Sequence, residues 1–179
     1  MFQGFSINKY KYYKLPEPGS IKELSAIMEV SAIPLNIDFA NLYDNISGTF
    51  ERIFYKRNIV APTNLINSLI QGAKPIIKSI KKYHNRKRPH QAALDFGVTF
   101  IYHNMESAKT PSFPSGHAAQ SQLVAQVLSD IYPRLTTEFM KAAKNIGHSR
   151  VVGRVHYKYD IEIGEKLGND LYSHYLNNA

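Results

Sequence analysis

Residues 114–131 read PSGHAAQSQLVAQVLSDI and join a loop pattern to a helical one. Apolar residues from Leu123 onward recur at three- and four-residue spacing, which predicts a helix with one apolar face that ends before Pro133. Ser115 and Gly116 stand where the loop enters this helix. Free backbone N–H groups at such a start favour an anion, and glycine lets the anion approach closely. An ordinary serine cap would give the same local pattern.

Helical patterns also precede this stretch. Ser20 is a good N-cap for a helix that runs to about Ser31. Thr63 is a second N-cap, for an apolar helical face that continues to Tyr83. Pro75 should kink or divide this second helix, because proline lacks the N–H that the helix needs. Residues 37–54, between these two helices, have mixed periodicity that is compatible with another helix.

The rest of the chain adds no strand pattern. Residues 84–114 resemble a long polar connection, and long connections in compact domains are often functional. From Thr136 or Thr137 the sequence stays compatible with helix, and the glycines that could interrupt it are Gly147, Gly153 and Gly164. We therefore predict an all-α fold: a single-domain helical bundle over residues 20–179, preceded by an irregular N-terminal arm over residues 1–19.

Length and charge limit the class of protein. The chain has 179 residues, enough for one domain, and a formal charge of +8, which favours anionic partners or reflects a merely basic surface. It has no cysteine, which excludes disulfides and a cysteine nucleophile. We find no signal-peptide pattern and no stretch of 18 uncharged apolar residues, so we expect a cytoplasmic or otherwise soluble protein without a transmembrane segment.

Three short blocks within residues 81–160 carry the chemistry that the chain offers. In chain order they are Lys81-x6-Arg88-Pro89, Pro114-Ser115-Gly116-His117 and Ser149-Arg150-x5-His156-x3-Asp160. Any one block could arise by chance, whereas all three in this order are a strong signal.

Lys81, Arg88 and Arg150 supply three positive charges. A phosphoryl group in transfer carries negative charge on its equatorial oxygens, so its site needs fixed positive groups. Arginine holds two oxygens in a planar fork, and lysine acts as a compact charge. With three cations present, no metal is required to neutralise the group, and we find no metal-ligand spacing. Taken singly, each cation is more often a surface residue.

His156 and Asp160 are four residues apart, so on a helix they share one face and can touch. A carboxylate on one imidazole nitrogen fixes the tautomer and leaves the other nitrogen free to attack. A local surface pair is the commoner explanation for an isolated pair of this kind. His117, in the first turn of its helix, could likewise be a capping or surface residue.

Together the three blocks resemble the signature of the type 2 phosphatidic acid phosphatase (PAP2) superfamily, which includes bacterial class A acid phosphatases and vanadium-dependent haloperoxidases. The resemblance implies the helical bundle of that family and a phosphohistidine on His156, with His117 as general acid and base. Asp160 would orient His156. The implied phosphate ligands are Lys81, Arg88, Ser115, Gly116 and Arg150.

The resemblance also implies partners. The substrate would be a phosphorylated small molecule or a lipid phosphate, with no obligatory nucleic acid. No cofactor is implied, although vanadate would serve as a transition-state mimic or inhibitor. A homo-oligomer is compatible with a family whose members often pair.

Two alternatives stay open. A vanadate-dependent haloperoxidase-like enzyme would use the same pocket, although haloperoxidases of this family are usually much longer. A non-catalytic phosphate- or nucleic-acid-binding module would use the basic residues alone, with the Tyr/Lys-rich segment Lys9–Lys14 as support. That module does not explain the two histidines and the aspartate. Outside the blocks, we expect His84, His90, His103 and His148 to be structural or surface residues, with His103 and His148 the likelier of the four to line the pocket. Arg154 and Lys158 could extend anion recognition or face solvent.

Overall fold

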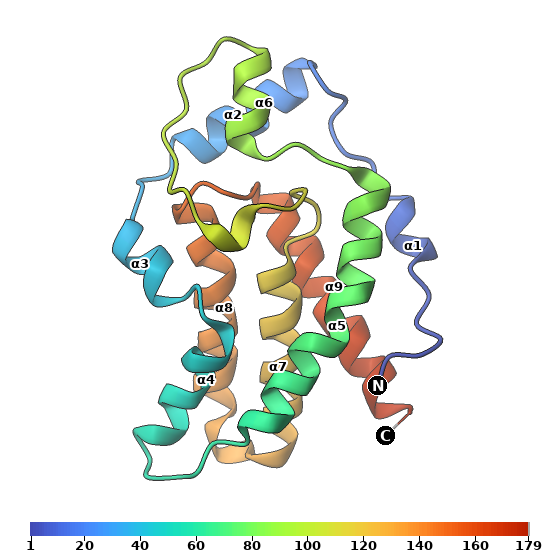
Figure 1. The fold of residues 1–179 in the computed structure, drawn as a ribbon, viewed down its shortest axis with the longest axis vertical. Helices are drawn as coiled ribbons and strands as arrows, with labels where there is room; N and C mark the ends of the chain where they lie inside the picture. Colours follow the sequence, from blue (N-terminus) through green and yellow to red (C-terminus); the bar gives the residue numbers. More distant parts are fainter. Residues whose placement is uncertain (179) are drawn as a thin grey trace.

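The computed structural model describes residues 1–178, which form helices and contain no strand (Figure 1). The all-α prediction is confirmed. The elements are α1 (Asn8–Lys11), α2 (Ile21–Ser31), α3 (Ile37–Leu42), α4 (Ile46–Tyr55), α5 (Thr63–His84), α6 (Pro89–Asp95), η1 (Glu106–Ala108), α7 (Gly116–Ile131), η2 (Pro133–Leu135), α8 (Thr136–Val152) and α9 (Lys158–Leu176).

Helix α7 lies at the centre of the bundle and packs against α8, α9 and α5, with α4 in front of α8 (Figure 1). Its apolar residues Leu123, Val124 and Leu128 are completely buried, as the spacing predicted. Removing these side chains from water stabilises the bundle. Within residues 1–178, none of the helices combines the length and the apolar character needed to cross a bilayer.

The backbones of α7 and α9 approach each other unusually closely. A Cβ atom at Gly164 would lie 2.6 Å from the carbonyl oxygen of Ser115, and one at Gly168 would lie 2.6 Å from that of Ala119. The Ser115 N–H donates to the carbonyl oxygen of Asp160 at 2.9 Å. The glycines therefore place the start of α9 against the start of α7, where two of the three sequence blocks meet.

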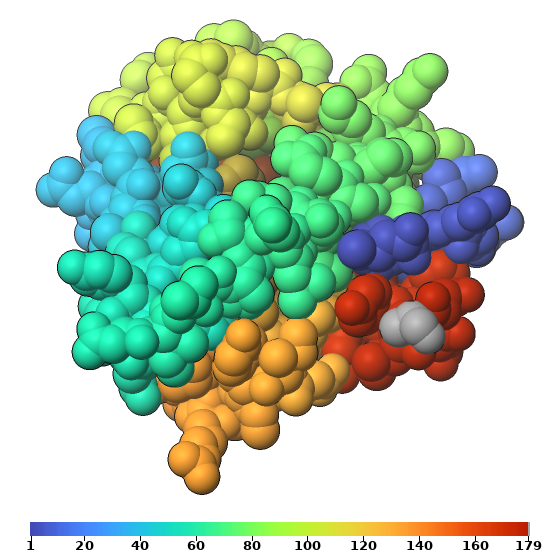
Figure 2. Space-filling model, turned by 60° about the horizontal axis from the view of Figure 1, so that its bottom comes forward, coloured from blue at the N-terminus to red at the C-terminus, as the bar shows by residue number. Residues whose placement is uncertain are grey.

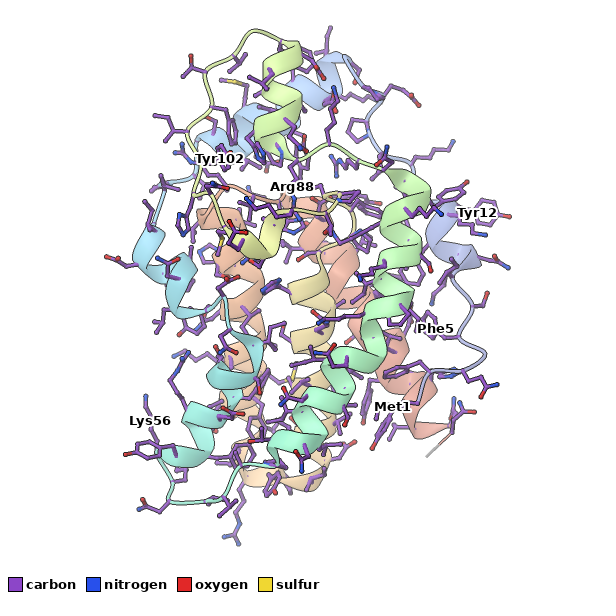
Figure 3. All side chains as sticks on the ribbon, in the orientation of Figure 1. Met1, Phe5, Tyr12, Lys56, Arg88 and Tyr102 are labelled. Carbon is purple, nitrogen blue, oxygen red and sulfur yellow. The ribbon has the colours of Figure 1, made fainter. Side chains whose placement is uncertain are left out.

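Helices α2 and α6 form a separate layer above the bundle (Figure 1). They share a small apolar core with Tyr157, which precedes α9; its other buried members are Ile27, Val30, Ala92 and Ala93. Arg88 lies between this upper layer and the bundle (Figure 3). The layer therefore covers the end of the bundle at which the predicted site residues gather.

The N-terminal arm is less irregular than predicted. Residues 8–11 form one helical turn, and Tyr10 in this turn is completely buried. The Tyr10 hydroxyl donates to the Asp170 carboxylate on α9. Figure 3 shows Met1 and Phe5 beside the lower parts of α5 and α9, whereas Tyr12 points outward. Aromatic side chains thus fasten the arm to the bundle.

Several predicted helix boundaries need correction. Ser20 caps α2 as expected, accepting a hydrogen bond from the Glu23 N–H at 3.2 Å. The prediction that Thr63 is an N-cap is wrong, because Thr63 is already helical and Pro62 occupies the cap position without a side-chain bond. Helix α5 is not divided at Pro75 but continues through it, and Figure 1 shows a bend in its course.

Two of the predicted helix breaks are absent, because the glycines concerned serve the packing of helices. Gly147 and Gly164 lie inside continuous helices, and only Gly153 follows a helix end. These two glycines mark close packing between helices rather than interruptions. Residues 84–114 were predicted to be a connection but contain α6 and η1, and residues 37–54 contain two helices. Helices this short lack the length over which a period can be detected.

Replacing Gly164 with alanine should lower the free energy of unfolding by about 1–3 kcal/mol, because the new methyl group would clash with the Ser115 carbonyl. This reverses the usual helix preference for alanine over glycine. Urea unfolding followed by circular dichroism measures the change. The exposed Lys166→Ala, on the same helix, should stay within about 0.5 kcal/mol. An unchanged or higher midpoint for Gly164→Ala would contradict the close packing.

Candidate active site

A cavity of about 450 Å³ lies at the N-terminal end of α7. Figure 2 shows a hollow there, bordered by the α3–α4 segment (light blue to cyan), α5 (green) and the segment around η1 (yellow). Five of the eight predicted site residues line the cavity, and they are Lys81, Arg88, Gly116, His117 and His156. The other three are completely buried next to them: Ser115, Arg150 and Asp160. All three sequence blocks therefore converge on one cavity.

His156 and Asp160 meet across a helix start, not along a helix face as predicted. His156 lies in the loop before α9, whereas Asp160 lies in the first turn of α9. The Asp160 carboxylate accepts from His156 Nδ1 at 3.1 Å and from the Tyr157 N–H at 3.1 Å. Because an ionised carboxylate only accepts, Nδ1 carries the proton and Nε2 is left with its lone pair. Nε2 is therefore the nitrogen that His156 can offer to the cavity.

Two residues that sequence reasoning missed complete the surroundings of Asp160. Arg86 donates from a side-chain N–H at 2.7 Å, and Ser112 donates from its hydroxyl. Burial alone raises the pKa of Asp160, but the bond from His156, the charge of Arg86 and the bond from Ser112 together lower that pKa to about 2. Arg86 also stacks over the Tyr157 ring, 3.8 Å from its centre. Asp160 is thus a fixed anion behind His156.

Backbone carbonyls hold Lys81 and Arg88 in the cavity wall. Lys81 Nζ donates to the carbonyls of Pro111 and Ser112. Arg88 donates to the carbonyl of Thr110 at 2.8 Å and to that of Val155 at 2.7 Å. Burial, followed by the charge of Arg88, lowers the pKa of Lys81 to about 7.

The pKa of Arg88 falls to about 10, through burial and then the charge of Arg150. Each cation therefore destabilises another, and an anion in the cavity would relieve this repulsion.

Ser115 acts as the ordinary helix cap in this structure. Its hydroxyl oxygen accepts from the Ala118 N–H at 3.3 Å, and its side chain is completely buried. The cavity lining begins instead with Gly116. A hydroxyl that accepts this bond still has its own proton to donate, so a phosphate contact of Ser115 stays a prediction, and the free end of α7 lies at the cavity.

Arg150 is separated from the cavity by Asp44. Its guanidinium donates to Asp44 Oδ1 at 2.5 Å and to Ser107 Oγ at 3.0 Å, while its buried Nε has no hydrogen-bond partner among the described residues. The Ser107 hydroxyl also donates to Asp44, at 2.6 Å. Asp44 and Ser107 line the cavity, and Arg150 does not. In this arrangement the Arg150 guanidinium contacts Asp44 and Ser107, and its contact with a phosphate stays a prediction.

Asp44 also holds His117. His117 Nε2 lies 2.9 Å from the Asp44 carbonyl oxygen and 3.2 Å from Asp44 Oδ1. Because a carbonyl only accepts, Nε2 must carry a proton. Burial and then Arg150 lower the pKa of His117, and the bond and charge of Asp44 oppose this. Asp44 precedes the sequence blocks by more than thirty positions, and no local pattern marks it.

The family model of the PAP2 superfamily matches residues 60–168, more than half of the chain and all three blocks. The chain belongs to the PAP2 superfamily. A segment of the chain is 31% identical over 113 residues to a non-specific acid phosphatase of Salmonella typhimurium. A segment is also 30% identical over 115 residues to a non-specific acid phosphatase of Salmonella typhi. These matches cover 58% and 59% of this chain. They span only 41% and 42% of the relatives' own lengths.

Solved structures share this PAP2 fold. The first bacterial vanadium-dependent iodoperoxidase superposes with a TM-score of 0.60 at 20% identity, over 93% of this chain and 51% of that one. A transmembrane PAP2-type phosphatidylglycerolphosphate phosphatase from Bacillus subtilis gives 0.53 at 18% identity, over 87% and 83%. The predicted bundle of the acid phosphatase and haloperoxidase type is therefore confirmed.

Two histidines expected near the PAP2 pocket lie away from it. His103 Nε2 contacts the Asn41 amide oxygen at 2.7 Å, and His148 is exposed with its ring edge-on to Phe39. Neither lines the cavity. Both are therefore the structural or surface residues that we expected by default, and neither is the pocket neighbour that they were the likelier of the four to be.

Arg154 and Lys158 do not extend the anion site. The Arg154 guanidinium donates to the carbonyls of Ile33 and Ile101 and so fastens two loops together. Lys158 pairs with Glu29 at 2.6 Å on the surface. Within residues 1–178, no group of three or more histidine and acidic side chains is placed to hold a metal ion.

Replacing Asp44 with asparagine should lower the pKa of His117 further. The substitution removes a negative charge that stabilises the imidazolium and leaves the positive charge of Arg150 uncompensated. A histidine titration by NMR measures the shift. The exposed Asp38→Asn, with the same charge change, should leave the titration of His117 in place. A rise in the pKa of His117 would show that Asp44 does not support its charged form.

Proposed function

We propose that this chain is a metal-independent phosphatase that hydrolyses phosphate esters through a phosphohistidine on His156. One observation carries the proposal: a buried imidazole whose Nδ1 is fixed by an ionised carboxylate lines a cavity shared with Lys81 and Arg88. Burial lowers the pKa of His156 well below its ordinary value, and nearby Arg88 adds to this. The imidazole is therefore neutral and nucleophilic at neutral pH.

In the first step, His156 Nε2 attacks phosphorus and forms an N–P bond while the P–O bond to the leaving group breaks. Lys81, Arg88 and the backbone N–H groups that begin with Gly116 stabilise the negative oxygens. His117 gives its proton to the departing oxygen. Asp160 stabilises the positive charge that His156 acquires.

In the second step, His117 is neutral and accepts a proton from a water molecule. The resulting hydroxide attacks phosphorus, the N–P bond breaks, and phosphate leaves. His117 regains its proton and His156 returns to neutrality, so the cycle balances. In the described arrangement Arg150 contributes through its charge, and direct contact requires the Asp44 carboxylate to move aside.

Replacing His156 with alanine should reduce phosphate release from p-nitrophenyl phosphate by about 10⁴-fold or more, because it removes the imidazole that the Asp160 carboxylate fixes for attack. The wild-type rate should persist with EDTA. The exposed His148→Ala should keep wild-type turnover. An alkaline quench should capture phosphate on His156 in the wild type, since phosphohistidine survives base. Undiminished turnover in His156→Ala would refute the nucleophile.

Vanadate separates this proposal from the haloperoxidase-like alternative. A five-coordinate vanadate bound by the same cations should inhibit phosphate release as a transition-state mimic. Halide oxidation by peroxide with vanadate, in the absence of any phosphate release, would instead favour the alternative.

The pH profile of kcat/KM should be bell-shaped, with its maximum below pH 6.5. His156 must be neutral, which requires a pH above its pKa, and that pKa lies well below 6.5. His117 must be protonated, which requires a pH below its own lowered pKa. Activity therefore falls on both sides of an acidic window. His117→Asn should abolish the alkaline limb, and a wild-type maximum above pH 7 would contradict the assigned proton states.

A further inference from the structure

Helix α5 brings a row of lysines to the cavity. Lys74, Lys78 and Lys81 are spaced by four and three residues, so they share one face of the helix, and all three line the cavity. Lys81 is buried at the base, where the proposed phosphohistidine chemistry takes place. Lys74 and Lys78 are exposed at the rim. The row therefore leads from the reacting phosphorus towards solvent.

The two rim lysines carry charge that no described carboxylate neutralises. Neither Lys74 nor Lys78 forms an ion pair with residues 1–178, so both charges are available to an anion in the cavity. Asp44 is the one acidic residue in the described cavity lining, and Arg150 already pairs with it. The cavity mouth is therefore positive and has no internal counter-ion.

The open space at Lys78 and Lys81 extends beyond the first cavity. A second hollow of about 440 Å³ adjoins the first and shares Lys78, Lys81 and Thr110 with it. It adds Lys82, another α5 lysine. An α-helix rises 1.5 Å per residue, so Lys78 and Lys74 stand about 4.5 Å and about 10.5 Å along the axis from Lys81. Flexible lysine stems at these positions can reach an anionic group adjacent to a phosphate held at Lys81.

From this geometry we propose that Lys74 and Lys78 form a second anion subsite, which binds a phosphate carried by the leaving group. The preferred substrates are then compounds with two phosphates, either joined as a diphosphate or separated on a short carbon skeleton. This rests on the proposed phosphatase activity. His156 takes the phosphoryl group at the base, the P–O bond to the leaving group breaks, and the lysines stabilise the departing anion.

The test compares inorganic pyrophosphate, fructose 1,6-bisphosphate and p-nitrophenyl phosphate, which has a single phosphate. In the double variant Lys74→Gln/Lys78→Gln, kcat/KM for at least one doubly phosphorylated substrate should fall tenfold or more relative to that for p-nitrophenyl phosphate. A fall confined to pyrophosphate identifies adjacent phosphates, and one confined to the bisphosphate identifies separated ones. The pair Lys74→Arg/Lys78→Arg should restore the preference. Added salt should weaken it in the wild type.

Lys166→Gln, which removes an exposed charge of α9 away from the cavity, should leave all three rates at wild-type values. If the double variant loses the same factor for all three substrates, or loses nothing for the doubly phosphorylated ones, the subsite is disproved. If the folded wild type releases no phosphate from any of the three, the proposed phosphatase function itself fails. Far-UV circular dichroism verifies that each variant is folded.

Discussion

The buried carboxylate of Asp160 is the constraint on which the site depends. Ionising a carboxylate away from water is costly unless donors surround it. Here the donors come from three segments of the chain. Arg86 follows α5, Ser112 lies in the loop before α7, and His156 and the Tyr157 N–H lie directly before α9. The carbonyl of Asp160 in turn accepts from Ser115. Satisfying one anion therefore fixes three chain segments and the orientation of the imidazole together.

What the sequence could predict was local or periodic. The apolar face of α7 and the Ser20 cap of α2 were predictable because their signals lie within a few residues of one another. The three blocks identified the cavity because their order and spacing are specific, even though the physics of each residue alone favoured a surface role. Of the eight site residues that the blocks predicted, five line the cavity and the other three are completely buried next to them.

What it could not predict depends on contacts between distant segments. Asp44 reaches His117 and Arg150 only because the α3–α4 loop folds over the start of α7, and an isolated aspartate in a loop carries no signal of that. Arg86 lies in a run of basic residues, and no pattern in the sequence distinguishes it from its neighbours. Sequence alone does not distinguish a glycine that ends a helix from one, such as Gly164, that allows a neighbouring backbone to approach.

The cavity favours the binding of an anion because its buried positive charges repel one another. Lys81 and Arg88 are buried beside each other, and their pKa values fall to about 7 and about 10. A bound phosphate would supply the missing negative charge and raise both pKa values. Near pH 7 Lys81 is protonated in only part of the molecules, so anion binding draws in a proton and grows stronger as the pH falls. Burial destabilises the charged forms of these cations in the empty site. It thereby makes the affinity for phosphate depend on pH.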